Sequence, residues 1–310
     1  MIILEILLLV VGFAMLVKGA DWFVEGAAGI ASKFGIPQLV VGLTIVAMGT
    51  SAPEAAVSIT AALKGTADIA VGNVVGSNIL NVLVILGLTG LITSVAVQKS
   101  TLFIEIPYML VVTGVLLVMG MLGNSINLAE GIILWAMFIL YLAYLFVLAK
   151  KGKSEEEAKE ARPLWKLLLF ALVGGGVVVL GSNIAVDSAT AIAQIIGLSE
   201  KFIGLTIVAL GTSLPELVTS VTAARKGNAD IAIGNIVGSN IFNILFVLGT
   251  SALIIPIPYQ SAFLFDGIIA VLAGVVLWVA TIRKRELNRT WGIIMLLCYA
   301  AYLAYSLSLG

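Results

Sequence analysis

The segment GLTIVAMGTSAPEAAVSITAALKGTADIAVGNVVGSNILN, residues 42–81, returns 162 residues later as GLTIVALGTSLPELVTSVTAARKGNADIAIGNIVGSNIFN, residues 204–243. The two copies are identical at 29 of 40 positions, and most differences exchange one aliphatic residue for another. The identities concentrate on Gly, Thr, Ser, Pro, Glu and Asn, which are poor choices for simple hydrophobic filling. A duplication kept for stability alone would spread its similarity evenly, so we interpret the repeat as functional.

The composition around this repeat is that of a membrane protein. The 310 residues are 61% hydrophobic and 11% charged, with a mean hydropathy of +1.16. Soluble domains are nearer about 45–50% apolar and about 25% charged, so we predict an all-α polytopic membrane protein. The single cysteine, Cys298, excludes an intramolecular disulfide and a cysteine metal cluster. The chain has no histidine and no net charge, so we expect neither histidine chemistry nor a nucleic-acid partner.

Apolar segments of about 20 residues predict ten transmembrane helices. They cover residues 2–29, 38–63, 69–93, 101–120, 127–149, 164–190, 200–224, 230–254, 261–281 and 290–308. The first segment has no basic leader and no clear cleavage site, so we predict a retained helix and not a signal peptide.

The longest polar stretch divides the ten helices into five and five. We predict one transmembrane domain, 1–310, built from a first repeat 1–149, a linker 150–163 and a second repeat 164–310. Because five is odd, the second repeat enters the membrane from the opposite side, which makes an inverted repeat of the kind found in secondary transporters. Fourteen of the 17 Lys and Arg residues fall in loops on one side. This bias predicts a cytoplasmic linker and both termini outside the cell membrane.

Two glutamates lie near the middle of apolar spans, Glu54 in the second and Glu216 in the seventh. An acidic residue at this depth costs at least about 2.5 kcal/mol. No Lys or Arg is expected at matching depth, since Lys18 belongs near one end of its span. We therefore expect the charge of −2 to be balanced by one Ca²⁺ or two Na⁺. The alternative is a pair of protonated carboxyls that bond neighbouring helices.

A proline precedes each glutamate and follows weak helix formers, as in Gly49-Thr50-Ser51-Ala52-Pro53. Proline removes a helix hydrogen bond and clashes with the preceding turn. We expect helices 2 and 7 to break at their centres, with the carbonyls around Ala47–Thr50 and Ala209–Thr212 pointing at a cation. The alternative is an ordinary proline kink.

The second half of each copy carries a polar stripe. Asn73, Ser77 and Asn81 recur at a spacing of four, and so do Asn235, Ser239 and Asn243, so each set shares a helical face. Hydroxyl and amide oxygens are hard ligands that suit Na⁺ and Ca²⁺. Facing the two broken helices, these stripes would complete a cage of oxygen atoms. Asp21, Glu25, Asp187, Glu105 and Asp266 lie near span ends, and we interpret them as interfacial charges without a role.

The paired motifs GTSAPE and GTSLPE, each followed about 23 residues later by GSNI, resemble the cation/calcium antiporter family, which contains the sodium/calcium exchangers. The chain is similar to the small prokaryotic members, since it lacks the large cytosolic regulatory loop of animal exchangers. The resemblance implies that Glu54 and Glu216 are central ligands shared by Ca²⁺ and Na⁺. It implies further ligand oxygens from Thr50, Thr212, Ala47, Ala209, Ser51, Ser213, Ser77, Ser239, Asn81 and Asn243.

The chain departs from part of the family at one pair of positions. Several members have Asp where this chain has Asn81 or Asn243, and potassium-dependent exchangers typically have Asp at the second. Asparagine at both positions indicates that potassium is not transported and keeps the site at −2.

The resemblance implies an electrogenic antiporter, working by alternating access with three Na⁺ per Ca²⁺. It would be no enzyme and need no cofactor. Separately, we expect the chain to be a monomer in the lipid bilayer. A H⁺/Ca²⁺ exchanger of the same fold is the alternative, followed by a cation channel. An intramembrane enzyme is disfavoured, because the serines have no histidine or suitably placed lysine as a base. The long first and sixth spans are the expected gate, and Gly174–Gly176 would let them slide or bend.

Overall fold

The computed structural model describes residues 2–151, 162–196 and 209–308, and they are almost entirely helical. Most of the predicted linker 150–163 and the first part of the predicted span 200–224 lie outside the described residues. Seven helices of the described part are long and apolar enough to cross a membrane, or eight if a bent pair counts as one span. This count does not reach the predicted ten. Of the predicted spans, 200–224 and 290–308 are the two without such a helix.

The helices that carry the repeat occupy the interior of the molecule. In the first copy they are α2 (Gln38–Val41), η1 (Gly42–Val46), α3 (Ala47–Thr50), α4 (Ala52–Leu63), α5 (Asp68–Leu80), η2 (Asn81–Leu86) and α6 (Gly87–Ile92). In the second copy they are α11 (Ala209–Thr212), α12 (Leu214–Arg225), α13 (Ala229–Phe242), η5 (Asn243–Leu248) and α14 (Gly249–Ile254). The most apolar window of Ala229–Ile254 is 94% buried, against 22% for the peripheral helix α8 (Leu128–Lys151).

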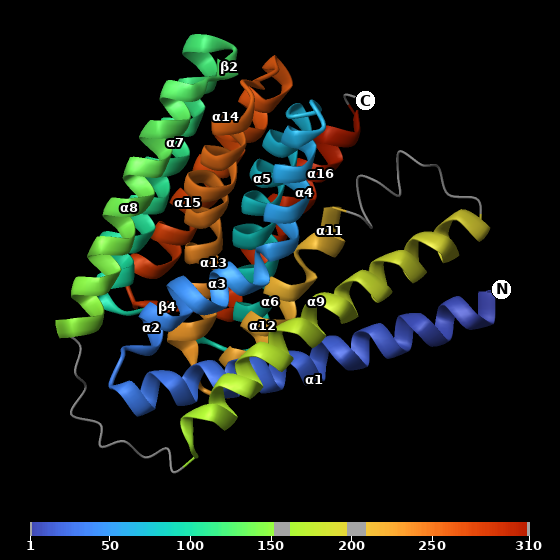
Figure 1. Cartoon of the computed structure of the whole chain (residues 1–310), viewed down its shortest axis with the longest axis vertical. Helices are drawn as coiled ribbons and strands as arrows, with labels where there is room; N and C mark the ends of the chain where they lie inside the picture. The colour runs from blue at the N-terminus through green and yellow to red at the C-terminus, as the bar shows by residue number, and fades with distance from the viewer. Residues whose placement is uncertain (1, 152–161, 197–208, 309–310) are drawn as a thin grey trace.

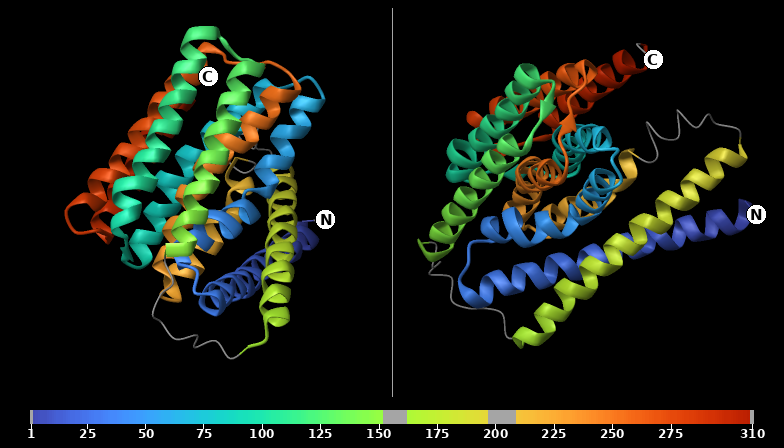
Figure 2. Two further views of the ribbon diagram at one scale, coloured as in Figure 1. Left: turned by 60° about the vertical axis from the view of Figure 1, so that its left-hand side comes forward. Right: turned by 45° about the horizontal axis from the view of Figure 1, so that its top comes forward.

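Two groups of helices enclose this interior (Figures 1 and 2). On one side lie α1 (Ile2–Phe34) and α9 (Leu164–Ile195), which run obliquely across the other helices. On the other side lie η3 (Thr101–Glu105), α7 (Ile106–Gly123), α8, α15 (Ser261–Ile282) and α16 (Arg289–Ser308). The repeat motifs therefore face protein on both sides, which is the setting in which polar groups and irregular backbone are tolerated within a membrane.

The long helices α1 and α9 pack against each other along their backbones. A Cβ atom on Gly174 would lie 2.4 Å from the Phe23 nitrogen, and one on Gly26 would lie 2.5 Å from the Ala171 nitrogen. Contacts move toward the start of α9 as they move toward the end of α1, so the helices are antiparallel. Glycines on both surfaces allow this close approach.

Two short antiparallel ladders join segments that are far apart in the sequence, and the sequence did not predict them. Strand β1 (Val95–Ala96) pairs with β4 (Glu286–Leu287), and β2 (Ser125–Ile126) pairs with β3 (Ile257–Pro258). The all-helical prediction is thus right for the bulk of the fold and incomplete at these turns. Each strand is two residues long, which is too short to give a periodic signal.

At least three of the acids interpreted as interfacial charges have specific partners. Glu105 is fully buried and accepts a hydrogen bond from the Tyr144 hydroxyl, so it is not an exposed charge. A buried carboxyl group needs such a partner to offset its desolvation. Asp266 accepts a hydrogen bond of 2.9 Å from Tyr302. On α1, the carboxylate of Asp21 lies 3.1 Å from Lys226 Nζ.

Candidate functional site

Both motif helices break at a serine, one turn before the glutamate. Ser51 and Ser213 leave the helical conformation with ψ angles of 8° and 5°. The two halves of the first broken span, Gln38–Thr50 and Ala52–Leu63, meet at a bend of 52°. The prolines lie just after the breaks, in the first turns of α4 and α12, where a helix tolerates a missing N–H. Glu54 and Glu216 occupy the same first turns, where the helix dipole favours negative charge.

The two glutamates are buried together at the centre of the molecule. Glu54 is 1% exposed and Glu216 is fully buried. Ser51 Oγ donates a hydrogen bond of 2.7 Å to Glu216 Oε1, and Ser213 Oγ donates one of 3.3 Å to Glu54 Oε1. The serine of each copy thus holds the glutamate of the other copy. Within the described residues, the second carboxyl oxygen, Oε2, of each glutamate has no hydrogen-bond partner.

The stripe residues nearest the start of α5 and α13 support the backbone that carries the glutamates. Asn73 Nδ2 donates to the Glu54 carbonyl at 3.3 Å and to Ser58 Oγ at 2.9 Å. Asn235 Nδ2 repeats this with the Glu216 carbonyl at 3.4 Å and Ser220 Oγ at 2.9 Å. The predicted ligands Asn73 and Asn235 therefore position α4 and α12. Asn235 also accepts a hydrogen bond of 3.0 Å from Thr50 Oγ1.

An asparagine quartet joins the other halves of the copies. Asn81 Nδ2 donates to Asn240 Oδ1 at 3.0 Å, and Asn243 Nδ2 donates to Asn78 Oδ1 at 3.4 Å. Asn78 and Asn240 also donate to each other's carbonyls, at 3.2 Å in both directions. The Oδ1 atoms of Asn81 and Asn243 are buried without a partner in the part of the chain that the structure describes. The π-helical turns η2 and η5 begin at Asn81 and Asn243 and pack against α12 and α4, which carry the two glutamates.

The carbonyls at the breaks differ from the prediction. The Ala47 carbonyl is not left free, because it accepts from the Ser51 amide at 3.0 Å, Thr50 Oγ1 at 3.3 Å and Ser239 Oγ at 3.4 Å. A proline removes the donor to the carbonyl four residues earlier, so Pro53 frees Gly49. In the second copy Pro215 frees Gly211, whose carbonyl accepts a hydrogen bond of 2.9 Å from Ser182 of α9.

The remaining predicted residues lie around this centre. Ser77 and Ser239 are buried, at 4% and 0% exposure, while Thr212 is half-buried and Ala209 begins α11. The sequence prediction missed Asn78, Asn240, Ser58 and Ser220, although each pair is conserved between the two copies of the repeat. Among the described residues no group of three or more His, Cys, Asp or Glu side chains gathers. The groups that donate to the two carboxylates are the neutral hydroxyls of Ser51 and Ser213.

Comparison with known proteins identifies relatives over the whole chain. The family model described as sodium/calcium exchanger protein matches residues 4–147 and 166–308. The putative antiporter CaxA of Alkalimonas amylolytica is 38% identical over 304 residues, covering 94% of this chain and 95% of that protein. The sodium/calcium exchanger MaX1 of Methanosarcina acetivorans is 31% identical over 349 residues, covering 98% of each. Among solved structures, the sodium–calcium exchanger NCX_Mj superposes with a TM-score of 0.85 at 31% identity, covering 98% of this chain and 99% of that one.

Proposed function

Because the chain belongs to the sodium/calcium exchanger family, we propose that it is a secondary active antiporter that exchanges Na⁺ for Ca²⁺ across a membrane. The observation that carries this proposal is the crossed pairing of Ser51 with Glu216 and of Ser213 with Glu54. Each serine fixes one carboxyl oxygen and leaves the other, Oε2, unpartnered within the described residues. Two carboxylates held in this way carry a charge of −2 that a transported cation balances.

We propose that both ions use the same oxygen atoms. One Ca²⁺ or two Na⁺ neutralise the carboxylates, and neutral oxygens complete the coordination that hard cations prefer. Shared ligands prevent the two ions from crossing together, which is the basis of antiport. The full set proposed, to supply these oxygens or to hold them in position, is Ala47, Thr50, Ser51, Glu54, Asn73, Ser77, Asn81, Ala209, Thr212, Ser213, Glu216, Asn235, Ser239 and Asn243.

The exchange is proposed to be electrogenic, with three Na⁺ for each Ca²⁺. Three Na⁺ bring a charge of +3 and Ca²⁺ brings +2, so each cycle moves one net charge. One elementary charge is worth about 2.3 kcal/mol per 100 mV of membrane potential. The membrane potential would then contribute to the driving force along with the Na⁺ gradient.

The architecture proposed for this cycle is ten transmembrane helices in two inverted repeats, 1–149 and 164–310, with helices 2 and 7 broken at Ser51 and Ser213. The antiparallel α1–α9 pair and the contacts that recur when the copies are exchanged support it. The Lys and Arg distribution supports a cytoplasmic linker, 150–163, and both termini outside the cell membrane. We propose that one chain suffices, because both halves of the site come from one chain.

Calcium flux into vesicles tests the function and its coupling ion. The purified protein is reconstituted into proteoliposomes, and ⁴⁵Ca²⁺ uptake is measured with outward gradients of Na⁺, K⁺ or H⁺ applied singly. We expect uptake with the Na⁺ gradient alone. Uptake driven by the pH gradient and not by Na⁺ would replace this proposal by H⁺/Ca²⁺ exchange. Flux that needs no counter-ion would indicate a channel.

The variants Glu54→Gln and Glu216→Gln test the site. Each removes one charge and keeps the size of the side chain, so we expect each to abolish exchange. Glu105→Gln is the matched control, since Glu105 is also a fully buried carboxyl and lies outside the site. Exchange retained in both site variants would contradict the assignment of the glutamates.

A further inference from the structure

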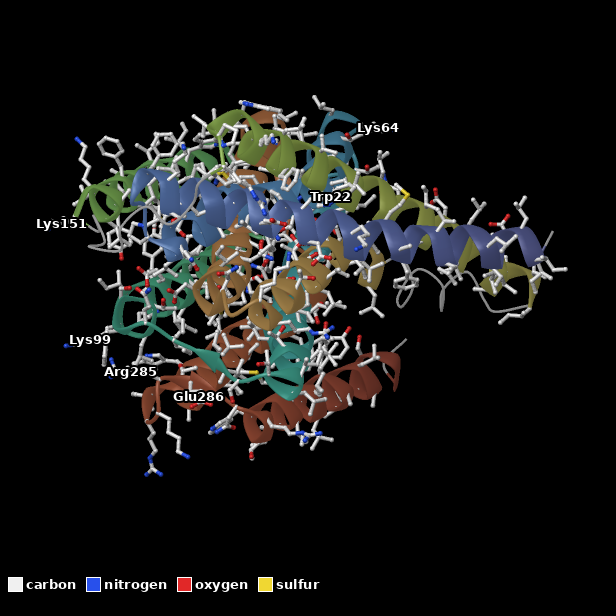
Figure 3. The ribbon with its side chains drawn as sticks, turned by 90° about the horizontal axis from the view of Figure 1, so that it is seen from below. Trp22, Lys64, Lys99, Lys151, Arg285 and Glu286 are labelled. Atoms are coloured by element: carbon white, nitrogen blue, oxygen red, sulfur yellow. The ribbon has the colours of Figure 1, made fainter. Side chains whose placement is uncertain are left out.

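Three cationic side chains line one surface pocket at the end of the molecule where β1 pairs with β4. The pocket has a volume of about 320 Å³ and is lined by Lys99, Leu102, Phe103, Ile282, Arg283 and Arg285. Lys99 lies just before η3, and the two arginines follow the end of α15. Figure 3 shows Lys99 and Arg285 beside each other at one edge of the molecule. Segments about 180 residues apart in the sequence thus bring their charges to one place.

The backbone fixes these two segments to each other. In the β1–β4 ladder Val95 pairs with Leu287 and Ala96 with Glu286, and the Val97 amide donates to the Arg285 carbonyl at 2.8 Å. On the other wall, Trp278 Nε1 of α15 donates to the Leu102 carbonyl at 3.0 Å. The pocket is therefore preformed, and a ligand would not have to assemble it.

No described residue compensates the charges that line the pocket. Within the described residues, the side chains of Lys99, Arg283 and Arg285 have no hydrogen-bond or ion-pair partner. Glu286 is the one acid in the 283–289 turn, and it does not line the pocket. By contrast, Lys226 at the end of α12 is paired with Asp21. Three unpaired cations in one pocket select for an anion.

The turn between α7 and β2 is the equivalent, in the first repeat, of the turn between α15 and β4 that carries the arginines. It forms the same backbone without these cations. Asn124 and Arg285 share a left-handed conformation, with φ of 52° and 50°, and their carbonyls accept from the Tyr259 and Val97 amides. Asparagine tolerates this conformation better than arginine. Asn124 therefore corresponds to Arg285, and Tyr259 corresponds to Val97. By the same alignment, Leu122 corresponds to Arg283 and Ser261 corresponds to Lys99. Arg285 therefore occupies a backbone position that favours another residue, which points to a use for its side chain.

We propose that this pocket binds the phosphate group of an anionic phospholipid. Arginine pairs with phosphate through two parallel hydrogen bonds, and lysine adds a point charge. Phe103 and Ile282 line the same pocket and are 55% and 43% exposed, so an acyl chain can cover them. Basic pockets between transmembrane helices are a recognised form of lipid headgroup site. This apolar continuation favours a lipid over a soluble phosphate, and the inference goes beyond ion exchange.

Native mass spectrometry of the purified full-length protein in detergent tests the proposal. Phosphatidylglycerol is titrated against phosphatidylcholine with the same acyl chains, and glycerol 3-phosphate is the soluble probe. The pocket variant is Lys99→Ser/Arg283→Leu/Arg285→Asn, which installs the residues of the other copy. The control, Lys150→Gln/Lys151→Gln/Arg289→Gln, removes as many charges from residues that do not line the pocket; Figure 3 shows Lys151 at the same end of the molecule as Lys99 and Arg285.

We expect the wild type and the control to prefer phosphatidylglycerol, and the pocket variant to lose about ten-fold or more in affinity for it. Equal loss in the pocket and control variants would mean that the cations act only as a general surface charge. Binding of glycerol 3-phosphate as tightly as the lipid would replace the lipid by a soluble anion. If the triple variant does not fold, Arg285→Asn alone decides: unchanged lipid affinity there overturns the proposal.

Discussion

Ser51 and Ser213 each donate a hydrogen bond to the glutamate of the opposite copy. The bond from Ser51 is 2.7 Å long and the bond from Ser213 is 3.3 Å long. We expect Ser51→Ala to raise the ion concentration for half-maximal exchange by about ten-fold, because a hydrogen bond to a charged group contributes roughly 1.5–3 kcal/mol. Ser213→Ala should have a smaller effect. The measurement is ⁴⁵Ca²⁺ uptake against Na⁺ and Ca²⁺ concentration. Ser251→Ala is the control, at a buried serine whose hydroxyl donates to the Val247 carbonyl of η5, one turn earlier on the same span; an equal change there would remove the special role of the pair.

Within the asparagine quartet, we expect one residue to contribute mainly to stability and another mainly to ion binding. Asn240→Ala removes the acceptor of Asn81 and a donor to Asn78. Each buried polar group left unpaired costs about 1–3 kcal/mol, so we expect a lower free energy of unfolding. Asn243→Ala removes one longer bond and an unpartnered oxygen, so it should weaken ion binding more than stability. Denaturant unfolding in detergent and flux assays compare the two variants, and the reverse order would contradict the division of roles.

The repeat explains why so much of the site could be predicted from the sequence. Glu54 and Ser51 attract notice because a second copy preserves them in an otherwise apolar span. The stripe argument used a spacing of four, which selects Asn73, Ser77 and Asn81 and excludes Asn78. Asn78 lies about 100° around the helix, and its partner Asn240 comes from the other copy. Such a pairing is visible only once the two copies are brought together in space.

At the scale of elements, hydropathy placed the helices well because lipid demands long apolar segments. It ended the first and sixth helices at residues 29 and 190, whereas α1 and α9 continue to Phe34 and Ile195. The polar residues at these ends lower the hydropathy but do not stop a helix. The π-helical turns at Asn81 and Asn243 were not predicted, since they insert one residue into an unbroken apolar pattern.

The α1–α9 contact sharpens the gating hypothesis to one glycine. A Cβ on Gly174 would lie 2.4 Å from the Phe23 nitrogen, while one on Gly176 meets nothing within 4 Å. Gly174→Ala therefore forces the helices apart, which typically costs about 1–3 kcal/mol, and we expect slower exchange. Gly176→Ala, the matched control, should leave exchange near the wild-type rate and stabilise α9 slightly by its helix propensity. Equal rates in both variants would count against α1 and α9 moving as a pair.

At the scale of the whole molecule, the effect of membrane potential on exchange tests the stoichiometry. One Ca²⁺ or two Na⁺ balance the charge of −2 at the shared site, whereas three Na⁺ exceed it by one. With three Na⁺ per Ca²⁺, each Ca²⁺ that enters a vesicle is accompanied by one net positive charge leaving it. An interior-positive potential therefore favours Ca²⁺ uptake, and an interior-negative potential opposes it. The effect is independent of the orientation of the protein in the vesicle, because it is set by the equilibrium and not by the rate.

The size of the effect distinguishes the possible couplings. A potential of about 100 mV contributes about 2.3 kcal/mol per cycle, which corresponds to a change of about 50-fold in the Ca²⁺ ratio at equilibrium. Potassium gradients with valinomycin set the potential, and the ⁴⁵Ca²⁺ accumulated at fixed Na⁺ concentrations is measured once uptake has stopped. A ratio that does not respond to voltage means two Na⁺ per Ca²⁺. That result would leave the two carboxylates as the ion site, because two Na⁺ balance them as well as Ca²⁺ does, and would remove only the third Na⁺ position.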